Sequence, residues 1–184
     1  MIKYKRKEGG IFLNAEQRRK KILKILKESN NPITGSELSK ALGVSRQVIV
    51  TDVALLRAKG NNILSTPQGY ITVDKIGDKK YTETIAVKHG HSDIKSELET
   101  IINYGGKVID VTVEHPLYGE LKGMLMINSP NELEQFIKAL NDTKAKPLLV
   151  LTEGVHLHTI QADSEDIIKR IKETLKQKGF LIDE

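Results

Sequence analysis

The chain has 184 residues, of which 39% are hydrophobic and 29% charged, a composition typical of a globular protein that buries a core. It contains no run of about 18 apolar residues, which excludes a membrane-spanning helix, and its polar, lysine-rich start lacks the apolar segment of a signal peptide, so we expect a cytoplasmic protein with no membrane partner. The absence of cysteine excludes disulfides, thiol nucleophiles and iron–sulfur clusters, and it leaves His, Asp and Glu as the metal ligands available.

The positive charge is concentrated in the first part of the chain. Residues 1–75 hold 15 Lys and Arg against 6 Asp and Glu, whereas residues 76–184 hold 14 against 18. Clustered basic residues favour a nucleic-acid partner, because they release counterions from the phosphates. A solvated, lysine-rich surface helix would give the same charge, so the sequence motifs have to decide between the two.

Three helices are predicted in the basic part, over residues 14–30, 34–43 and 45–60. Apolar residues recur in each of them at helical spacing. Each helix begins with a side chain that can cap its first turn, and the second ends at a glycine; these residues are Asn14 with Gln17, Thr34 with Glu37, Ser45, and Gly43. A short helix, a turn of about four residues and a second capped helix form a helix-turn-helix.

A β-hairpin is predicted directly after the third helix. The β-rich segments 63–66 and 70–73 flank Pro67-Gln68-Gly69, a sequence that favours a turn. A hairpin at this place is the wing of a winged helix-turn-helix domain, which we assign to residues 1–75. Because the basic charge lies on the same residues as the motif, we expect this domain to bind DNA. A winged helix that binds another protein is the alternative.

The first residues of the third helix are the candidate DNA contacts, because this part of the motif faces the base edges of the major groove. The candidates are Ser45, Arg46, Gln47 and Thr51, and Val50 lies next to Thr51 on the same helix. Arginine can bond guanine, and glutamine can bond adenine, through two hydrogen bonds each. In the wing, Gln68 and Tyr70 are candidates to reach the adjacent DNA backbone or minor groove. An exposed loop without DNA contact is the alternative for these two.

The remaining residues predict a second domain of a different class. Residues 76–80 show no periodicity and are the expected linker. Beyond them the element order is β-α-β-β-α-β-α, which indicates an α+β sandwich over residues 82–184, with helices on one face of a mainly antiparallel sheet. Strands are predicted at 82–89, 107–114, 120–127, 148–151 and 157–161, and helices at 92–104, 129–142 and 164–178.

Three histidines and one glutamate are the candidate metal ligands. His156 and His158 alternate along a strand, so both imidazoles face the same side. Glu97 falls on the core-facing side of its helix, whereas Glu99 points outward. A buried carboxylate needs a partner, and an ion shared by Glu97, His156, His158 and His89 would supply it. The alternative is that these histidines are ordinary surface or hydrogen-bonded residues and that Glu97 reaches solvent.

His115 and Tyr118 lie in a second segment of interest, just before and within a predicted hairpin turn. His115 precedes a proline and is extended there, so it either bonds the backbone or faces a ligand pocket. The sequence contains neither a nucleophile elbow nor a glycine-rich loop between a strand and a helix. This argues against a serine hydrolase and against a nucleotide-binding enzyme.

Several of these segments together carry a resemblance to a known family. They are Gly43–Val50 (GVSRQVIV), Thr66–Tyr70 (TPQGY), Val87–His89 (VKH), Glu114–Gly119 (EHPLYG) and Glu153–His158 (EGVHLH). Over nearly the whole chain the sequence resembles bacterial niacin-responsive transcriptional repressors, in which a winged helix of the biotin-repressor type is followed by a three-histidine (3H) domain.

The resemblance implies a C-terminal fold similar to the phosphocarrier HPr, one divalent transition metal ion per chain (Ni, Zn, Fe or Co), nicotinic acid as co-repressor, and a homodimer. It also implies operator DNA upstream of genes for NAD biosynthesis or niacin uptake. Carried onto the matching positions, the metal ligands are His89, Glu97, His156 and His158, and the segment with His115 and Tyr118 becomes the candidate ligand contact. Four protein ligands leave one or two coordination positions to which nicotinate can bind.

Other functions of such a site remain open at this point. A metal ion with open positions can activate water for hydrolysis, with Glu114 or Glu153 as the base. The metal can also be the signal itself, as in a metal-sensing repressor. Phosphotransfer through a histidine is suggested by the implied fold, although a fold does not imply a function. We expect a repressor and not an enzyme.

Overall fold

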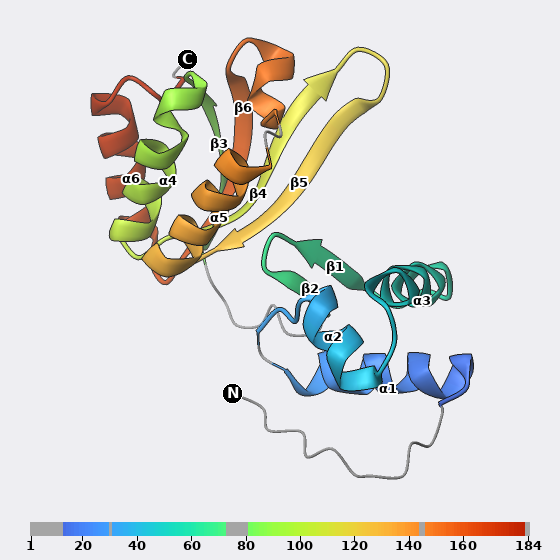
Figure 1. Cartoon of the computed structure of the whole chain (residues 1–184). Helices are drawn as coiled ribbons and strands as arrows, with labels where there is room; N and C mark the ends of the chain where they lie inside the picture. The colour runs from blue at the N-terminus through green and yellow to red at the C-terminus, as the bar shows by residue number, and fades with distance from the viewer. Residues whose placement is uncertain (1–12, 30, 73–80, 144–145, 183–184) are drawn as a thin grey trace. The chain divides into compact units, whose positions relative to one another are not determined.

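The computed structural model describes residues 13–29, 31–72, 81–143 and 146–182. The chain divides into two compact units, Met1–Gly77 and Asp78–Glu184, which we describe separately (Figure 1). The predicted linker, residues 76–80, lies outside the described residues. None of the helices in the described part of the chain has the length and apolar composition that crossing a membrane requires.

The N-terminal unit has the predicted helices and hairpin. Both predicted capping boxes are confirmed, because Asn14 and Thr34 each accept from the backbone of the third helical residue, whose side chain bonds back. Gly43 ends the second helix in the left-handed conformation, with φ 67°. The elements are α1 (Ala15–Glu28), α2 (Gly35–Leu42), α3 (Arg46–Ala58), β1 (Ile63–Thr66) and β2 (Gly69–Thr72).

The hairpin is attached to the segment that precedes α2. Ile33 and Tyr70 donate a backbone hydrogen bond to each other, at 2.9 and 2.8 Å. Gly69 makes this approach possible, since a Cβ there would lie 2.4 Å from the carbonyl of Ile33. The three helices and β1 share one apolar core, which includes Ile22, Leu26, Leu38, Ile49 and Val53.

The C-terminal unit is a four-stranded sheet in the order β3-β6-β4-β5, and every neighbouring pair is antiparallel. The α+β class and the order β-α-β-β-α-β-α are as predicted, with two short 3₁₀ helices added. The elements are β3 (Tyr81–Lys88), η2 (His91–Asp93), α4 (Ile94–Asn103), β4 (Lys107–His115), β5 (Gly119–Ile127), α5 (Pro130–Asp142), η3 (Leu148–Thr152), β6 (Val155–Ala162) and α6 (Glu165–Gln177).

The helices of this unit cover one face of the sheet, as predicted (Figure 1). One core joins them to the strands, with Leu98 and Ile101 from α4, Ile171 from α6, and Val87 and Ile160 from β3 and β6. Because side chains alternate along a strand, every second residue of β6 faces this core, and His156 and His158 lie on that side.

One predicted strand is wrong. Residues 148–151 form part of the 3₁₀ helix η3 and not a strand. A short apolar run does not distinguish the two structures by itself, and the burial here is not alternating, since Leu149 is buried while Val150 and Leu151 are exposed. Glu153, with φ 50°, and Gly154, with φ 93°, then turn the chain into β6.

Candidate metal centre and nucleic-acid interface

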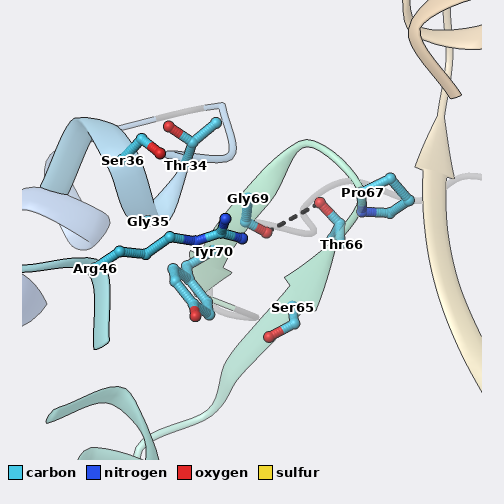
Figure 2. A pocket seen from close by; sticks show the side chains of 9 residues that line it. All are labelled: Thr34, Gly35, Ser36, Arg46, Ser65, Thr66, Pro67, Gly69 and Tyr70. Carbon is cyan, nitrogen blue, oxygen red and sulfur yellow. Dashed lines mark hydrogen bonds between the residues drawn. The ribbon is translucent and has the colours of Figure 1, made fainter. Parts of the chain in front are cut away.

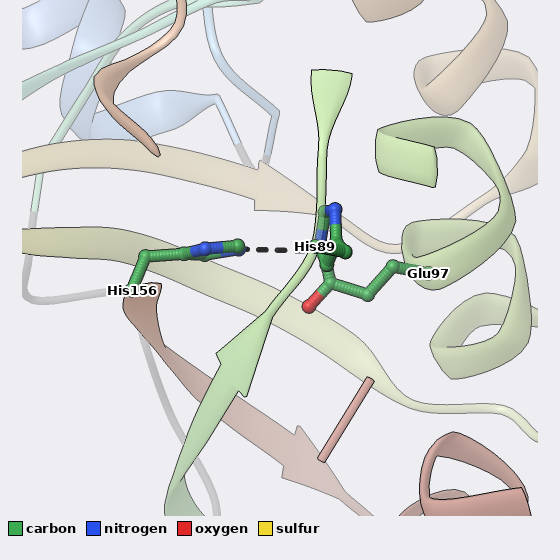
Figure 3. A group of neighbouring side chains, drawn as sticks. All are labelled: His89, Glu97 and His156. Carbon is green, nitrogen blue, oxygen red and sulfur yellow. Dashed lines mark hydrogen bonds and ion pairs between the residues drawn. The ribbon is translucent and has the colours of Figure 1, made fainter. Parts of the chain in front are cut away.

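The predicted metal ligands come together in the C-terminal unit. The carboxylate oxygen Oε2 of Glu97 lies 2.8 Å from Nε2 of His89, 3.4 Å from Nε2 of His158 and 3.6 Å from Nε2 of His156. All four side chains are buried, and Glu97 is 1% exposed. Figure 3 shows three of them, Glu97 on α4 and His89 and His156 beside it. The predicted inward direction of Glu97 and outward direction of Glu99 are both confirmed.

The sheet register explains this meeting. His158 pairs with Ile85 and His156 with Val87 across the β3–β6 ladder, so these residues face the core together. His89 extends β3 on the same side, and its backbone N–H donates to the carbonyl of Gly154 at 3.3 Å. A Cβ at Gly154 would lie 2.5 Å from the carbonyl oxygen of His89. The backbone approach that brings His89 to the other ligands therefore needs a glycine.

Backbone carbonyls orient all three imidazoles. The Nδ1 atoms of His89, His156 and His158 lie 2.9, 2.9 and 2.6 Å from the carbonyl oxygens of Gly90, Gly154 and Asp110. A carbonyl only accepts, so each Nδ1 carries the proton, and the lone pair of a neutral ring is then on Nε2. Three Nε2 atoms therefore converge on a carboxylate. This arrangement is repulsive unless a proton or a metal ion lies between them.

The pKa values of the cluster also indicate that a positive charge is shared between the imidazoles and the carboxylate. Burial by itself raises the pKa of the Glu97 carboxyl, but the charge of His158 and hydrogen bonds with the three imidazoles hold that pKa well below its usual range. Burial lowers the pKa of His89 and of His158, and the hydrogen bond and charge of Glu97 more than reverse this, so both pKa values are raised. The pKa shifts therefore favour an ionised carboxylate that shares a positive charge with the imidazoles around it.

The residues fit a transition metal ion. Ligand atoms held about 2.1 Å from one tetrahedral ion lie about 3.4 Å apart, which is close to the distances from Glu97 to His156 and His158. The second oxygen of Glu97, Oε1, is buried and has no hydrogen-bond partner among the described residues. Imidazole nitrogens with one carboxylate suit Zn, Ni, Fe or Co better than Mg or Ca.

A β-bulge supplies one of the orienting carbonyls. The register of β4 against β6 shifts between Val108 and Asp110, so Ile109 is an extra residue in the ladder. The carbonyl of Asp110 is thereby free to accept from His158. The carboxylate of Asp110 accepts from the N–H of Thr159 at 3.2 Å, so the bulge does not leave this donor unpaired. Sequence reasoning missed this role, although the spacing Val108, Val111, Val113 already departs from strict alternation.

His115 and Tyr118 remain predictions as ligand contacts. They lie at the end of the β4–β5 hairpin, with ring centroids 4.9 Å apart. Nδ1 of His115 accepts from the N–H groups of Leu117 and Tyr118, so this histidine bonds the backbone as an acceptor. The hydrogen bonds and ring contacts of both side chains are made within the hairpin. His91, at the start of η2, is exposed.

A hollow of about 550 Å³ adjoins the cluster at His89. Besides His89 it is lined by apolar side chains of η3 and by charged and glycine residues around them, namely Lys88, Gly90, Leu149, Val150, Glu153 and Gly154. Its volume lies within the usual range for small-molecule sites. The hollow is open to solvent, and it borders a histidine whose side chain is only 2% exposed.

The candidate DNA contacts lie on the N-terminal half of α3. Arg46, Gln47, Val50 and Thr51 are all exposed. Ser45 caps the helix by accepting from the N–H of Val48. The hydroxyl of Thr51 donates to the carbonyl of Gln47 at 3.1 Å, which leaves its methyl group toward solvent. Gln47 thus offers hydrogen bonds to a partner, and Val50 and Thr51 offer apolar contacts.

Of the two candidate DNA contacts in the wing, Tyr70 is better placed than Gln68. Tyr70 is half-buried between the hairpin and the segment before α2, and the guanidinium of Arg57 lies 6.0 Å from its ring. The side-chain amide atoms of Gln68 are shielded from solvent and have no hydrogen-bond partner among the described residues. Contact between Gln68 and DNA, as predicted, would require this side chain to change its rotamer.

Two basic residues of the N-terminal unit share one buried carboxylate. Asp52 on α3 is 2% exposed and accepts from Nε of Arg18 at 2.5 Å and from a terminal nitrogen of Arg19 at 3.2 Å. The pair joins α1 to α3 and so fixes the direction of the recognition helix. Sequence reasoning counted both arginines in the basic patch and did not detect this buried ion pair.

Replacing Asp52 with alanine is expected to destabilise the N-terminal unit by about 2–3 kcal/mol, because two partly buried arginines lose their counter-charge. Amide hydrogen exchange of α1 and α3 in the full chain measures this. The matched control is Glu28→Ala, which removes an exposed pair with Lys24 and should cost less than about 0.5 kcal/mol. Equal effects of the two substitutions would contradict a structural role for Asp52.

Comparisons with known proteins match both units. The model of the 3H domain family matches residues 82–184, and a model described as an HTH domain matches residues 18–71. A probable transcription repressor NiaR of Thermotoga maritima is 45% identical over 169 residues, which cover 92% of this chain and 95% of the relative. The transcription repressor NadR of Bacillus subtilis is 42% identical over 172 residues, covering 92% and 96%.

A third relative, an uncharacterized protein of Methanothermus fervidus, is 29% identical over 106 residues, which cover 54% of this chain and 17% of that protein. The two bacterial relatives are named as transcription repressors and not as enzymes, in agreement with the expectation for this chain. With a DNA-binding helix-turn-helix unit in front of a buried histidine cluster, the chain belongs to the NiaR/NadR family of transcription repressors, which combine an HTH domain with a 3H domain.

Proposed function

We propose that this repressor binds operator DNA as a homodimer when nicotinic acid occupies a metal site formed by His89, Glu97, His156 and His158. The observation that carries the proposal is the convergence of three Nε2 atoms on one buried carboxylate. The family resemblance supports nicotinic acid as the ligand. The regulated genes are then those for NAD biosynthesis or niacin uptake.

The chemistry of nicotinate suits the space beside the cluster. A metal ion with four protein ligands keeps one or two positions for a further ligand, and nicotinate offers a carboxylate and a pyridine nitrogen. The hollow at His89 is lined by Leu149 and Val150, which suit an aromatic ring, and by Lys88, which suits a negative charge and is opposed by Glu153. The chain's own residues would thus hold the metal, orient the ring and neutralise the carboxylate.

Control of DNA binding requires that the ligand favour the DNA-binding form. A ligand shifts this equilibrium only by its differential affinity for the two states. In a helix-turn-helix dimer, the competent form places two recognition helices about one DNA turn apart. We propose that Ser45, Gln47 and Thr51 of α3, together with Arg46, Gln68 and Tyr70 on the wing side, contact each half-site.

Titration of DNA binding with metal and nicotinate separately tests the proposal. The full chain is stripped with a chelator and mixed with duplex DNA selected from a random library. We expect nicotinate alone to have no effect, and metal with nicotinate to tighten binding about tenfold or more, within the usual range of coupling between sites. The variant His158→Ala should lose this response and keep its nonspecific DNA affinity. If metal without nicotinate tightens DNA binding to the same extent, the protein is instead a metal-sensing repressor.

A further inference from the structure

The first residue of the recognition helix does not extend away from the unit with its neighbours. Figure 2 shows the side chain of Arg46 reaching past Gly35 toward the wing, with Tyr70 beneath it. A Cβ built on Gly35 would lie 3.6 Å from Cγ and Nε of Arg46 and 3.6 Å from the ring of Tyr70. The side chain of Arg46 therefore lies between the start of α2 and the hairpin, and it remains exposed to solvent.

This place is a pocket of about 360 Å³. Its walls come from the start of α2, from α3 and from both wing strands, and are formed by Thr34, Gly35, Ser36, Arg46, Ser65, Thr66, Pro67, Gly69 and Tyr70. The lining contains hydroxyl groups and one cation but no carboxylate. In the described part of the chain, neither the guanidinium of Arg46 nor the hydroxyl of Ser36 has a hydrogen-bond or ion-pair partner.

The hydroxyls of Thr34 and Thr66 already donate to Glu37 and to the carbonyl of Gly69. A pocket that offers the guanidinium of Arg46 and the hydroxyl of Ser36, with no acidic side chain in its lining, suits an anion with several oxygens. On duplex DNA the strongly anionic groups are the phosphates, whereas the base edges are neutral. In the structure the side chain of Arg46 points toward the wing (Figure 2), and Gln47 and Thr51 are exposed on a neighbouring face of the same helix.

We propose that this pocket binds one backbone phosphate in each half-site, and that Arg46 positions the recognition helix instead of reading guanine. The bases are then read by Gln47 through hydrogen bonds and by Val50 and Thr51 through contacts with thymine methyl groups. The proposal rests on DNA binding by the N-terminal unit and is independent of the metal site.

Salt dependence and base preference separate the two roles of Arg46. The full chain is tested without metal on duplexes selected from a random library. Arg46→Gln should weaken binding about tenfold at every sequence, as expected for loss of a charged hydrogen bond. It should reduce the slope of log affinity against log salt by about 0.9 per chain and return the same base preference on reselection. Arg46→Lys should keep the slope.

Gln47→Ala is the matched control, since it lies next to Arg46 on the exposed surface of α3. It should change the preference at one base position and leave the salt slope unchanged. If Arg46→Gln instead changes the base preference with an unaltered slope, Arg46 reads a base and the proposal is wrong.

Replacing single DNA phosphates with uncharged groups identifies which phosphate contacts Arg46. Methylphosphonate groups, which carry no charge, are placed one at a time along the selected duplex. At one position per half-site the wild-type protein should lose about as much affinity as Arg46→Gln loses on normal DNA, and the two changes together should cost no more than either alone. If the losses add at every position, no phosphate occupies the pocket. Ser36→Ala should show a smaller loss at the same position.

Discussion

Replacing Glu97 with glutamine is expected to lower the affinity of the full chain for Zn²⁺ or Ni²⁺ by more than about 100-fold, while the fold is retained. Loss of a residue that only orients a ligand already costs about 10–100-fold, and Glu97 supplies the charge on which three imidazoles converge. Glutamine keeps the volume of the buried side chain and can donate to one Nε2, so the core does not collapse. Titration against a competing chelator measures the affinity.

The control for this prediction is Glu99→Gln, two residues further along α4. Glu99 is exposed, so its replacement should change neither metal content nor thermal midpoint. Equal metal affinity of the Glu97 variant and the wild type would show that Glu97 is not a metal ligand. The proposed co-repressor site would then lose its support, while the family membership would stand.

Replacing Gly154 with alanine is the second substitution with a large expected effect. Its φ of 93° is unfavourable for any residue with a Cβ, and the added methyl group would lie 2.5 Å from the carbonyl oxygen of His89. Because that atom belongs to the backbone, the segments around His89 and residue 154 have to separate, which changes the position of His89 relative to His156 on the strand that follows. We expect a loss of more than about 2 kcal/mol of stability and a metal affinity at least about tenfold weaker.

The control Gly179→Ala separates the cost of a left-handed backbone from the effect of the clash with His89. Gly179 has φ 73°, but an added Cβ there would meet nothing within 4 Å. It should therefore cost only the left-handed backbone strain of about 1–2 kcal/mol and leave metal affinity unchanged. Thermal unfolding and metal titration of both variants make the comparison. Similar metal affinities in the two variants would contradict the role of Gly154 in placing His89.

Local chemistry made the N-terminal unit predictable. The capping residues Asn14 and Thr34 and the helix-ending Gly43 act within one turn of their helices, so the sequence next to them was enough to place the helix ends. The ion pair between Asp52 and Arg18 joins residues 34 positions apart. No local pattern marks it, since a carboxylate on an amphipathic helix is normally exposed.

In the candidate metal centre, too, local patterns were more predictable than contacts between distant residues. Alternation along β6 placed His156 and His158 on one face, and the helical spacing of α4 placed Glu97 toward the core. The need of a buried carboxylate for a partner suggested that the two elements meet, and the family resemblance favoured this over the alternative of ordinary histidines. The carbonyl of Asp110 was not foreseen, since a bulge shifts the facing of a strand by one residue.

The C-terminal segment of the described chain is a further feature without a sequence signal. Leu181 forms a bridge with Val87 of β3, and the N–H of Lys88 donates to the carbonyl of Phe180 at 2.8 Å. The ring of Phe180 lies 5.2 Å from that of His89. Three residues after a helix are too few for periodicity to predict an added strand-like segment, yet they cover the edge of the sheet beside one of the proposed ligands.

The attachment of the wing to Ile33 limits how any effector can act on this repressor. Tyr70 and Ile33 are joined by two backbone hydrogen bonds, and Gly69 lies close to the same backbone, so the hairpin is connected to the segment before α2. This connection reduces the relative motion of the hairpin and the start of α2 within the N-terminal unit. We expect the proposed co-repressor to change the position of the N-terminal unit, or the lifetime of its complex with DNA, more than the geometry of α2 and the hairpin.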